Sequence, residues 1–372
     1  MIFLAYGGLL DNINVTRSSL PNFEDYVSEI ASIWSNHWLT NMGEKHDELE
    51  TQLKDFLSCK NIVLFTNGHL ALEAMLRVYG IKGEVITSPY TFASTTHAIT
   101  RVGAKPVFCD VKPSDLTLDE SKVEALITEH TEAIMPIHVY GNICNNDALQ
   151  KIAQKYNLKL LYDGAHSFAE SKDGVNTANM GDATMFSFHA TKVFHTIEGG
   201  AICFKDDTMR EKLLLEKNFG IPNAEEVLYP GGNAKMNEFQ AAMGICNLAI
   251  IHETIAKRRA LAEHYYQALE NTNVQIFIPQ ANVVSNYGYM PVLFSDETMR
   301  DKVYRHLAEK DIYARKYFYP ICNEFSCYEN TSAQTPIALS ASRRVLCLPL
   351  YPDLSMLEAD RVISTIKECI ND

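Results

Sequence analysis

IVLFTNGHLALEAMLRVYG, residues 62–80, joins a short β-rich apolar run to a helical pattern through a turn that contains Asn and Gly. The alternation continues through the apolar runs EVITS (84–88), PVFCDV (106–111), AIMPIHV (133–139) and KLLYD (159–163). Strands that alternate with helices predict an α/β fold with a mostly parallel sheet covered on both faces. Because ligands of such sheets bind beyond the carboxyl ends of the strands, we expect the chemistry of this chain just after each run.

Two later apolar runs, TMFSF (184–188) and GAICF (200–204), lie too close together for a helix to cross between them. A connection this short predicts neighbouring strands joined by a hairpin-like or irregular segment. That segment reads HATKVFHTIEGG and is rich in polar side chains. We therefore expect exposed polar groups in the connection.

The last third of the chain predicts a smaller unit. A loop rich in Gly and Asn (230–240) leads into a long helical stretch from Ala241 to about Ala268, and further helical patterns follow at 296–310 and near 353–370. We place the domain boundary near residue 250, within the long helix. Residues 1–250 then form a large α/β domain, and residues 251–372 form a smaller α+β domain.

Composition limits the classes of partner. The chain has 372 residues, with 33 Lys and Arg against 46 Asp and Glu, which gives a net charge of −13. Nucleic acids and anionic membranes are therefore not expected as partners, since both attract concentrated positive charge. The nine cysteines are dispersed and include no C-x-x-C pair. This pattern predicts reduced thiols and no zinc site, and with neither a basic leader nor a long apolar span we expect a cytoplasmic protein.

Three side chains could carry chemistry on a cofactor. Lys192 follows a run with no Lys, Arg, Asp or Glu back to Asp182, and such surroundings disfavour an ammonium ion and favour an amine that attacks an aldehyde. Asp163 ends a predicted strand, where a carboxylate could keep a pyridine nitrogen protonated. His166 could lie against the same ring. Taken singly, each has an ordinary explanation: an exposed lysine, a turn-capping aspartate and a half-buried histidine.

A phosphate site is predicted in the turn TNGHLALEAML (66–76). The turn leads from a strand into a helix N-terminus, where free N–H groups favour an anion, and Ser187 adds a hydroxyl donor. Neither a G-x-G-x-x-G nor a Walker sequence occurs, so these motifs do not predict a dinucleotide or a nucleoside triphosphate. With an aromatic side chain in YTFAS (90–94), the strand-end aspartate and the loop lysine, the set predicts a site for pyridoxal 5′-phosphate.

Several ordered motifs resemble the sugar-nucleotide aminotransferases of the DegT/DnrJ type, which have the pyridoxal-phosphate-dependent aspartate aminotransferase fold (fold type I). The resemblance runs over nearly the whole chain. It is carried by Asp-Gly-Ala-His (163–166), Gly181-Asp182, Phe186-Ser187-Phe188 with Lys192, Glu198-Gly199-Gly200 and GGNAKMNEFQAAMG (231–244).

The resemblance implies roles for the cofactor-binding residues. Lys192 corresponds to the lysine that forms a Schiff base with the cofactor, Asp163 to the partner of the pyridinium nitrogen, and His166 to the Gln or His beside the ring hydroxyl. The family often has Gly-Thr at the phosphate turn, and His69 departs from that, so backbone N–H groups are expected there. The other implied contacts come from Gly68, Ser187, Phe92 and Asn233. Of these, Asn233 would reach the phosphate of a neighbouring subunit, which implies a homodimer with shared active sites.

The substrate side of the resemblance is less specific. Regions that face sugar and diphosphate in similar enzymes contain His138, Tyr140, His195, Tyr317 and Tyr319. Each of these could instead be packed with its polar tip satisfied. The opening stretch (14–43) resembles the lead-in of bacterial enzymes that make dTDP-4-amino-4,6-dideoxyglucose.

The resemblance therefore implies transfer of an amino group from L-glutamate to a dTDP-4-keto-6-deoxyhexose, with dTDP-4-dehydro-6-deoxy-D-glucose as the preferred substrate. The product would be a precursor of a surface polysaccharide such as O-antigen. Amination at position 3 of the sugar stays open, because motifs that hold the cofactor do not decide how the sugar is turned. Two further functions also stay open, namely a cofactor-dependent sugar dehydratase and a non-catalytic binder of cofactor or nucleotide sugar.

Overall fold

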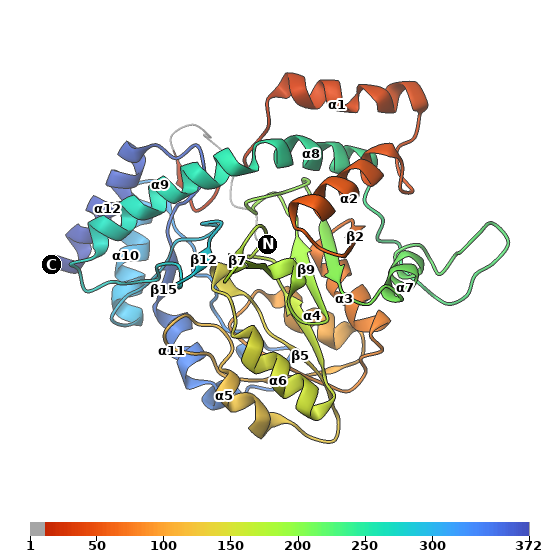
Figure 1. The fold of residues 1–372 in the computed structure, drawn as a ribbon. Coiled ribbons are helices and arrows are strands. Elements are labelled where there is room, and N and C mark those ends of the chain that lie inside the picture. Colours follow the sequence, from red (N-terminus) through yellow and green to blue (C-terminus); the bar gives the residue numbers. More distant parts are fainter. Residues whose placement is uncertain (1–11, 372) are drawn as a thin grey trace.

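A seven-stranded sheet forms the centre of the protein, whose computed structural model describes residues 12–371 (Figure 1). The strand order is β2-β10-β9-β6-β5-β3-β4. The strands are β2 (Asn61–Phe65), β3 (Glu84–Thr87), β4 (Lys105–Phe108), β5 (Thr131–Met135), β6 (Lys159–Asp163), β9 (Ala183–Ser187) and β10 (Gly200–Phe204). Only β10 runs antiparallel to its neighbours in this sheet. The prediction of a mostly parallel sheet is confirmed.

Helices cover both faces of this sheet, and the alternation of side chains along each strand explains why. In β2, Val63 and Phe65 pack in one core beneath α3 (Gly68–Val78), α4 (Ala93–Arg101) and α7 (Met209–Glu216). Ile62 and Leu64 point the other way and pack beneath α2 (Glu44–Phe56) and α8 (Glu238–Ala249). On that second face α6 (Asn146–Tyr156) covers β5 and β6. Strands buried on both sides read as continuous apolar runs, as this sequence does.

The predicted hairpin-like connection between the two late apolar runs is confirmed. β9 and β10 pair in antiparallel register, with Ser187 opposite Gly200. The loop between them, residues 188–199, starts and ends at one edge of the sheet. The parallel strands β2, β3, β5 and β6 end at this same edge. The loop that carries Lys192 therefore lies beside the carboxyl ends of the parallel strands.

A second core forms around the C-terminal residues. Its helices are α9 (Ile251–Leu269), α10 (Glu297–Glu309) and α12 (Met356–Asn371), and its strands are β11 (Gln275–Ile276), β13 (Pro291–Leu293), β14 (Ile312–Tyr313) and β15 (Val345–Cys347). The buried alanines of α11 (Pro336–Arg344) pack instead in a cluster that also contains Tyr90 and Ile137. α10 and α12 confirm the helices predicted at 296–310 and 353–370.

The N-terminal segment contributes to this second core. β1 (Ile13–Asn14) pairs in parallel with β14, and Ile13 is fully buried against side chains of α9 and α12. The predicted domain boundary near residue 250 stays a prediction. Residues 13–15 nevertheless pack with the C-terminal part of the chain, since the backbone N–H of Leu350 also donates to the carbonyl of Val15 (3.1 Å).

One expectation about the helices is wrong. The stretch 241–268 is not a single helix, because α8 and α9 are separated at Ile250, whose φ and ψ are −105° and 5°. Figure 1 shows the two helices running on in nearly one line, with α9 reaching the second core. No Gly or Pro stands at the break, so the sequence pattern gives no signal for it.

The remaining elements lie at the periphery. α1 (Phe23–Asn36) lies alongside α8, with the Trp34 ring edge-on to Phe239 at 5.7 Å (Figure 1). The other short elements are α5 (Glu120–Val123), β7 (Ser171–Lys172), β8 (Val175–Asn176) and β12 (Val283–Val284). Within residues 12–371, none of the helices combines the length and apolar character that crossing a membrane requires.

Candidate active site

A cavity of about 700 Å³ opens at the edge of the sheet where the parallel strands end. Most of the residues predicted for a cofactor line it. They are Gly68, His69, Phe92, Asp163, His166, Ser187 and Lys192, and Tyr317 of the predicted substrate set joins them. The structure therefore brings together residues that are spread over much of the sequence. Asn233 and the other substrate candidates do not line this cavity.

Lys192 projects from the loop between β9 and β10. The backbone N–H of Lys192 donates to the carbonyl of His189 (2.8 Å), which holds the loop in place. The side-chain Nζ of Lys192 donates to the hydroxyl of Tyr289 (3.0 Å). Burial lowers the pKa of Lys192 to about 8, against the opposing effects of Tyr317 and Asp163. Near neutral pH an appreciable fraction of this amine is uncharged, which is the form that attacks an aldehyde.

Asp163 is the last residue of β6 and is 4% exposed. Its carboxylate accepts hydrogen bonds from Thr95 Oγ1 (2.7 Å) and from the backbone N–H of Ala165 (3.0 Å). Burial raises the pKa of Asp163, while these two donors and the charge of Lys192 act in the opposite direction. A buried carboxylate held in one orientation favours a cationic N–H partner in the cavity, as a protonated pyridine nitrogen provides.

His166 is held as a neutral imidazole. Its Nδ1 accepts the backbone N–H of Tyr140 (3.1 Å), which leaves Nε2 to carry the ring proton. Burial, with the charge of Lys192, lowers the pKa of His166 well below its usual range. The ring lies parallel to Phe318, with centroids 5.7 Å apart, and the Tyr289 ring tilts against it at 4.6 Å. A flat, uncharged donor of this kind suits a ring hydroxyl.

The first turn of α3 forms a cradle for an anion. The side chain of Asn67 caps the helix by accepting the N–H of Leu70 (2.8 Å), which leaves the N–H groups of Gly68 and His69 without an intrahelical acceptor. A Cβ on Gly68 would lie 3.0 Å from Ser187 Cβ and 3.2 Å from Ser187 Oγ, so glycine permits the close approach of these groups. The cradle therefore fits a phosphate group.

The side chain of His69 has partners of its own outside the phosphate turn. Its Nδ1 lies 2.9 Å from Ser94 Oγ, and its Nε2 lies 3.1 Å from Glu73 Oε1. This placement supports the expectation that the phosphate turn acts through backbone N–H groups. Phe92, at the N-terminus of α4, is 53% exposed and lines the cavity, where its ring is free to pack on a flat ligand.

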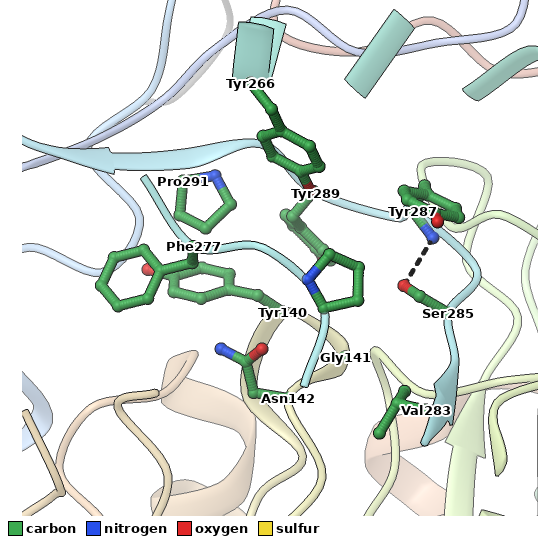
Figure 2. A pocket seen from close by; sticks show the side chains of 11 residues that line it. Tyr140, Gly141, Asn142, Tyr266, Phe277, Val283, Ser285, Tyr287, Tyr289 and Pro291 are labelled. Carbon is green, nitrogen blue, oxygen red and sulfur yellow. Dashed lines mark hydrogen bonds between the residues drawn. The ribbon is translucent and has the colours of Figure 1, made fainter. Parts of the chain in front are cut away.

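His138 and Tyr140 lie behind the cavity, which corrects the expectation that they face a sugar. His138 is completely buried, and its ring stacks on Tyr162 with centroids 4.5 Å apart. The backbone of Tyr140 has a positive φ of 58°. Its buried ring packs against Tyr289 and Phe318, which separate it from the cavity that they line. Its hydroxyl bonds the hydroxyl of Tyr90 (2.9 Å) and the carbonyl of Tyr317. Figure 2 shows Tyr140 in a second, small pocket beside Phe277.

His195 and Tyr319 are also placed outside the cavity. His195 is 1% exposed, with Nε2 2.5 Å from the carbonyl oxygen of Ser19, and Asn247 Nδ2 donates to its backbone carbonyl (2.9 Å). It ties the Lys192 loop to the N-terminal segment and to α8. The Tyr319 ring lies 4.8 Å from the guanidinium of Arg300, away from the cavity, and 42% of the residue is exposed.

Asn233 lies in the loop that follows α7 and is exposed to solvent. The base of this loop is tied down, because the carbonyl of Ala234 accepts the N–H of Thr66 (2.8 Å) and its N–H donates to the carbonyl of Lys217 (2.9 Å). Figure 1 shows residues of this loop projecting beyond α7. The predicted contact with a neighbouring subunit is consistent with this position and stays a prediction.

Sequence reasoning did not find several residues that line or support the cavity. The most important are Thr95, Tyr289 and Arg315. Thr95 lies in the first turn of α4, just beyond the segment YTFAS (90–94), and Tyr289 precedes β13. Neither residue stands immediately after a predicted strand of the large sheet. The motif ARKYFYP (314–320) did include Arg315, and its charge beside two tyrosines was a usable signal.

Comparisons with known proteins identify the family of this chain. The model of the DegT/DnrJ/EryC1/StrS aminotransferase family matches residues 22–367. Similar curated proteins include the dTDP-4-amino-4,6-dideoxy-D-glucose transaminase of Shigella dysenteriae, which is 40% identical over 96% of this chain and 98% of its own length. The GDP-perosamine synthase of Caulobacter vibrioides is 30% identical over 97% and 99%. A crystal structure of DesI in the presence of its TDP-sugar product superimposes with a TM-score of 0.92, 30% identity, and coverage of 97% and 93%.

The match covers nearly the whole chain, and the lysine, the strand-end carboxylate and the anion cradle fit one flat phosphorylated aldehyde. The cofactor is pyridoxal 5′-phosphate, and the fold is that of the fold type I enzymes. The chain belongs to the DegT/DnrJ/EryC1/StrS aminotransferase family and is a transaminase.

Proposed function

We propose that the enzyme transfers the amino group of L-glutamate to the 4-keto carbon of a dTDP-4-keto-6-deoxyhexose, with dTDP-4-dehydro-6-deoxy-D-glucose as the preferred substrate. The observation that carries this proposal is the 40% identity to a dTDP-4-amino-4,6-dideoxy-D-glucose transaminase over almost the entire chain. The cavity of about 700 Å³ supports it, because a nucleotide sugar needs far more room than an amino acid.

Lys192 is the proposed acid and base of both half-reactions. Bound pyridoxal phosphate supplies an aldehyde carbon that carries the amino group and a ring that accepts the electron pair of a broken C–H bond. Lys192 Nζ takes the proton from the carbon that bears the donor's amino group and delivers it to the C4′ atom of the cofactor. In the second half-reaction Lys192 moves the proton in the opposite direction. Tyr289 holds Nζ at 3.0 Å and so restricts the directions in which the amine can point.

Asp163 and His166 are proposed to hold the ring in its reactive state. The Asp163 carboxylate keeps a proton on the ring nitrogen, and Thr95 keeps the carboxylate ionised by donating to it. His166 Nε2 is the proposed donor to the ring hydroxyl. The Gly68 and His69 amides and Ser187 are the proposed phosphate ligands, with Phe92 packed on the ring.

The competing functions differ in what supports them. Amination at position 3 requires only that the sugar is turned in the same cavity, and the cofactor-binding residues would be unchanged. Family membership and Lys192 favour transamination over a sugar dehydratase, because a dehydratase adds no nitrogen. A purely sensory protein would have no need of a lysine whose pKa is lowered to about 8 beside a buried carboxylate.

We also propose a homodimer with shared active sites. Exposed apolar side chains on and after α1 support it, since a stable monomer rarely leaves such a group uncovered. They are Phe23, Val27, Trp34, Trp38 and Leu39. Asn233, exposed at the base of the loop that follows α7, would then reach the partner's phosphate site. A cytoplasmic location is supported by dispersed cysteines without a C-x-x-C pair, and a role in surface polysaccharide synthesis follows from the proposed product.

The test is incubation of the holoenzyme with L-glutamate together with one keto sugar. A dTDP-4-keto-6-deoxyhexose and a dTDP-3-keto-6-deoxyhexose are supplied in separate reactions. NMR of the product ring should show nitrogen at position 4, and its mass should show an amine in place of the ketone. Lys192→Ala is the matched control and should form no product. Nitrogen at position 3, a product without nitrogen, or turnover by Lys192→Ala would each contradict the proposal.

A further inference from the structure

Glu170 carries a completely buried carboxyl group to which the proposed mechanism gives no role. The residue lies after His166, directly before β7. Its Oε1 accepts hydrogen bonds from the backbone N–H of Asn286 (3.0 Å) and from Ser285 Oγ (3.2 Å). Its Oε2 is buried and has no hydrogen-bond partner within residues 12–371. Because burying such a group costs free energy, its presence points to a specific use of the oxygen that is paired.

The donors to Glu170 belong to a segment that ends in Tyr289. Residues 285–289, the 285–289 segment, lead from β12 to β13 in the second core. Figure 2 shows the start of this segment, where the backbone N–H of Tyr287 donates to Ser285 Oγ (3.1 Å). At its end, the hydroxyl of Tyr289 accepts the hydrogen bond from Lys192 Nζ (3.0 Å). The carboxyl group therefore holds the segment that brings a partner to the reactive amine.

Asn286 connects this carboxyl group to the walls of the active site. Its Nδ2 donates to the carbonyls of His166 and Phe168 (both 2.9 Å), and its Oδ1 accepts the N–H of Gly288 (2.8 Å). A Cβ on Gly288 would lie 3.2 Å from Cγ2 of Val193, the residue after the reactive lysine. The 285–289 segment is therefore bonded to the turn that bears His166 and packed closely against the lysine loop.

Glu170 is also in close contact with the chain beside Tyr140. A Cβ on Gly141 would overlap Glu170 Oε1, and the backbone of Gly141 has a positive φ of 93°. Both observations explain why glycine stands there. The preceding N–H, that of Tyr140, donates to His166 Nδ1 (3.1 Å). Glu170 therefore lies between two pieces of chain that each bond a residue of the cofactor site.

The carboxyl group can hold its donors as a neutral acid. Burial raises the pKa of Glu170 well above its usual range, against the opposing effects of the donors Asn286 and Ser285. A neutral acid still has a carbonyl oxygen that accepts hydrogen bonds. Glutamine has the same length and the same acceptor, so it should replace Glu170, whereas an apolar side chain of similar volume should not.

We propose that Glu170 is a positioning residue, which holds Tyr289 against the reactive amine of Lys192. It acts through Asn286, whose place in the 285–289 segment it fixes. The inference rests on the proposed acid–base role of Lys192 and adds to it the group that orients the partner of the amine. Without Oε1, the N–H of Asn286 loses its buried acceptor, and the segment should move away from the amine.

The first measurement titrates Lys192 in the cofactor-free enzyme, by trace acetylation and peptide mass spectrometry. Tyr289 accepts a hydrogen bond that favours the ammonium form. Glu170→Met should therefore lower the midpoint from about pH 8 by about 0.5–1 unit. Tyr289→Phe should lower it equally, and the double variant should show no further shift, because both changes break the same contact.

Two further variants of Glu170 test the chemistry of the contact. Glu170→Gln should keep the wild-type midpoint of Lys192, because it keeps the acceptor. Glu170→Asp, with a carboxyl group one methylene too short, should behave like Glu170→Met and tests the proposal if Glu170→Met does not fold. In the holoenzyme, Glu170→Met should lower kcat with glutamate by about 10-fold and change KM by less than about 3-fold, since a displaced base slows the proton transfer.

Glu238→Met is the matched control for a general loss of stability. Glu238 is 1% exposed and accepts three backbone N–H groups of residues 43–46 (2.8–3.3 Å). It is not among the described residues that line the cavity. Glu238→Met should lower the Tm much as Glu170→Met does, because each leaves buried donors unpaired, but it should leave the Lys192 midpoint unchanged.

The inference would be overturned by a Lys192 midpoint that stays or rises in Glu170→Met, or by additive shifts in the double variant. Equal shifts in Glu170→Met and Glu238→Met, a shift in Glu170→Gln, or a loss confined to KM would also overturn it. Failure of the proposed function looks different. The wild-type holoenzyme would then form no aminated sugar, while the titration of Lys192 without cofactor would still follow the expected pattern.

Discussion

The ionisation of Lys192 should be visible directly in the enzyme without cofactor. Burial lowers its pKa from the usual value of 10.5 to about 8. At pH 8 about half of the Lys192 side chains are then uncharged, whereas an amine with a pKa of 10.5 would be uncharged in roughly 0.3% of molecules. The reactive form is therefore more abundant by a factor on the order of 100. Since only the neutral amine reacts, the rate rises with pH and levels off above the folded pKa.

Trace acetylation followed by peptide mass spectrometry measures this titration residue by residue. The midpoint for Lys192 should lie near pH 8. Asp163→Asn should move that midpoint to lower pH, because the Asp163 carboxylate raises the pKa of Lys192. Lys217 is a sharp control: its pKa is also about 8, but it is completely buried and donates to the carbonyl of Leu64 (2.9 Å). It should stay unlabelled at every pH at which the protein is folded.

A midpoint for Lys192 near pH 10.5 would refute the reasoning, since burial would then not perturb the amine. A midpoint that rises in Asp163→Asn would refute the assignment of Asp163 as a group that favours the ammonium form. Labelling of Lys217 at the same pH as Lys192 would show that access to the cavity is not what distinguishes the two lysines.

Three further changes test the cofactor site. Thr95→Val removes a hydrogen-bond donor that lowers the pKa of Asp163. The acid limb of the pH profile of kcat/KM should therefore move to higher pH by about 1–2 units. An unchanged acid limb would show that Thr95 does not control the ionisation of Asp163. Gly68→Ala places a Cβ 3.0 Å from Ser187 Cβ and should weaken pyridoxal phosphate binding by about 10-fold to 100-fold in a spectroscopic titration. Unchanged binding would show that the close approach of Gly68 and Ser187 does not hold the phosphate. Asp163→Asn should retain the bound cofactor but lower kcat by about 100-fold to 1000-fold in steady-state assays, and near-normal turnover would contradict its role.

The predicted residues that line the one cavity come together for a simple reason. Asp163 and Ser187 end strands of the large sheet, and Gly68 begins the helix after another strand. Because parallel strands end at one edge, their order in the sheet hardly matters for the prediction, and residues far apart in sequence come together. The β2 to α3 turn also carries its own signal, in the Asn67 cap and the glycine that follows it.

The residues that were misplaced or missed depend on packing between segments that do not follow one another. Thr95 reaches Asp163 across the sheet edge, and Tyr289 reaches Lys192 from the second core, so no local pattern reports either contact. His138 does follow a strand, but the neighbouring Tyr162 offers a flat surface that its ring covers. Tyr140 has a positive φ, a conformation that tyrosine rarely adopts, so the sequence gives no sign of the turn there.

The strand pair β1 and β14 has a consequence for movement within the molecule. With Ile13 inserted among C-terminal side chains, the polypeptide passes between the two cores once before α1 and again at Ile250. If one core tilted against the other, both connecting segments would have to bend at the same time. The first connecting segment also contacts the Lys192 loop, because the carbonyl oxygen of Ser19 lies 2.5 Å from His195 Nε2. The same tilt would therefore displace the loop that bears the reactive amine. The position of the N-terminal segment and the position of Lys192 are therefore coupled through the contact between Ser19 and His195.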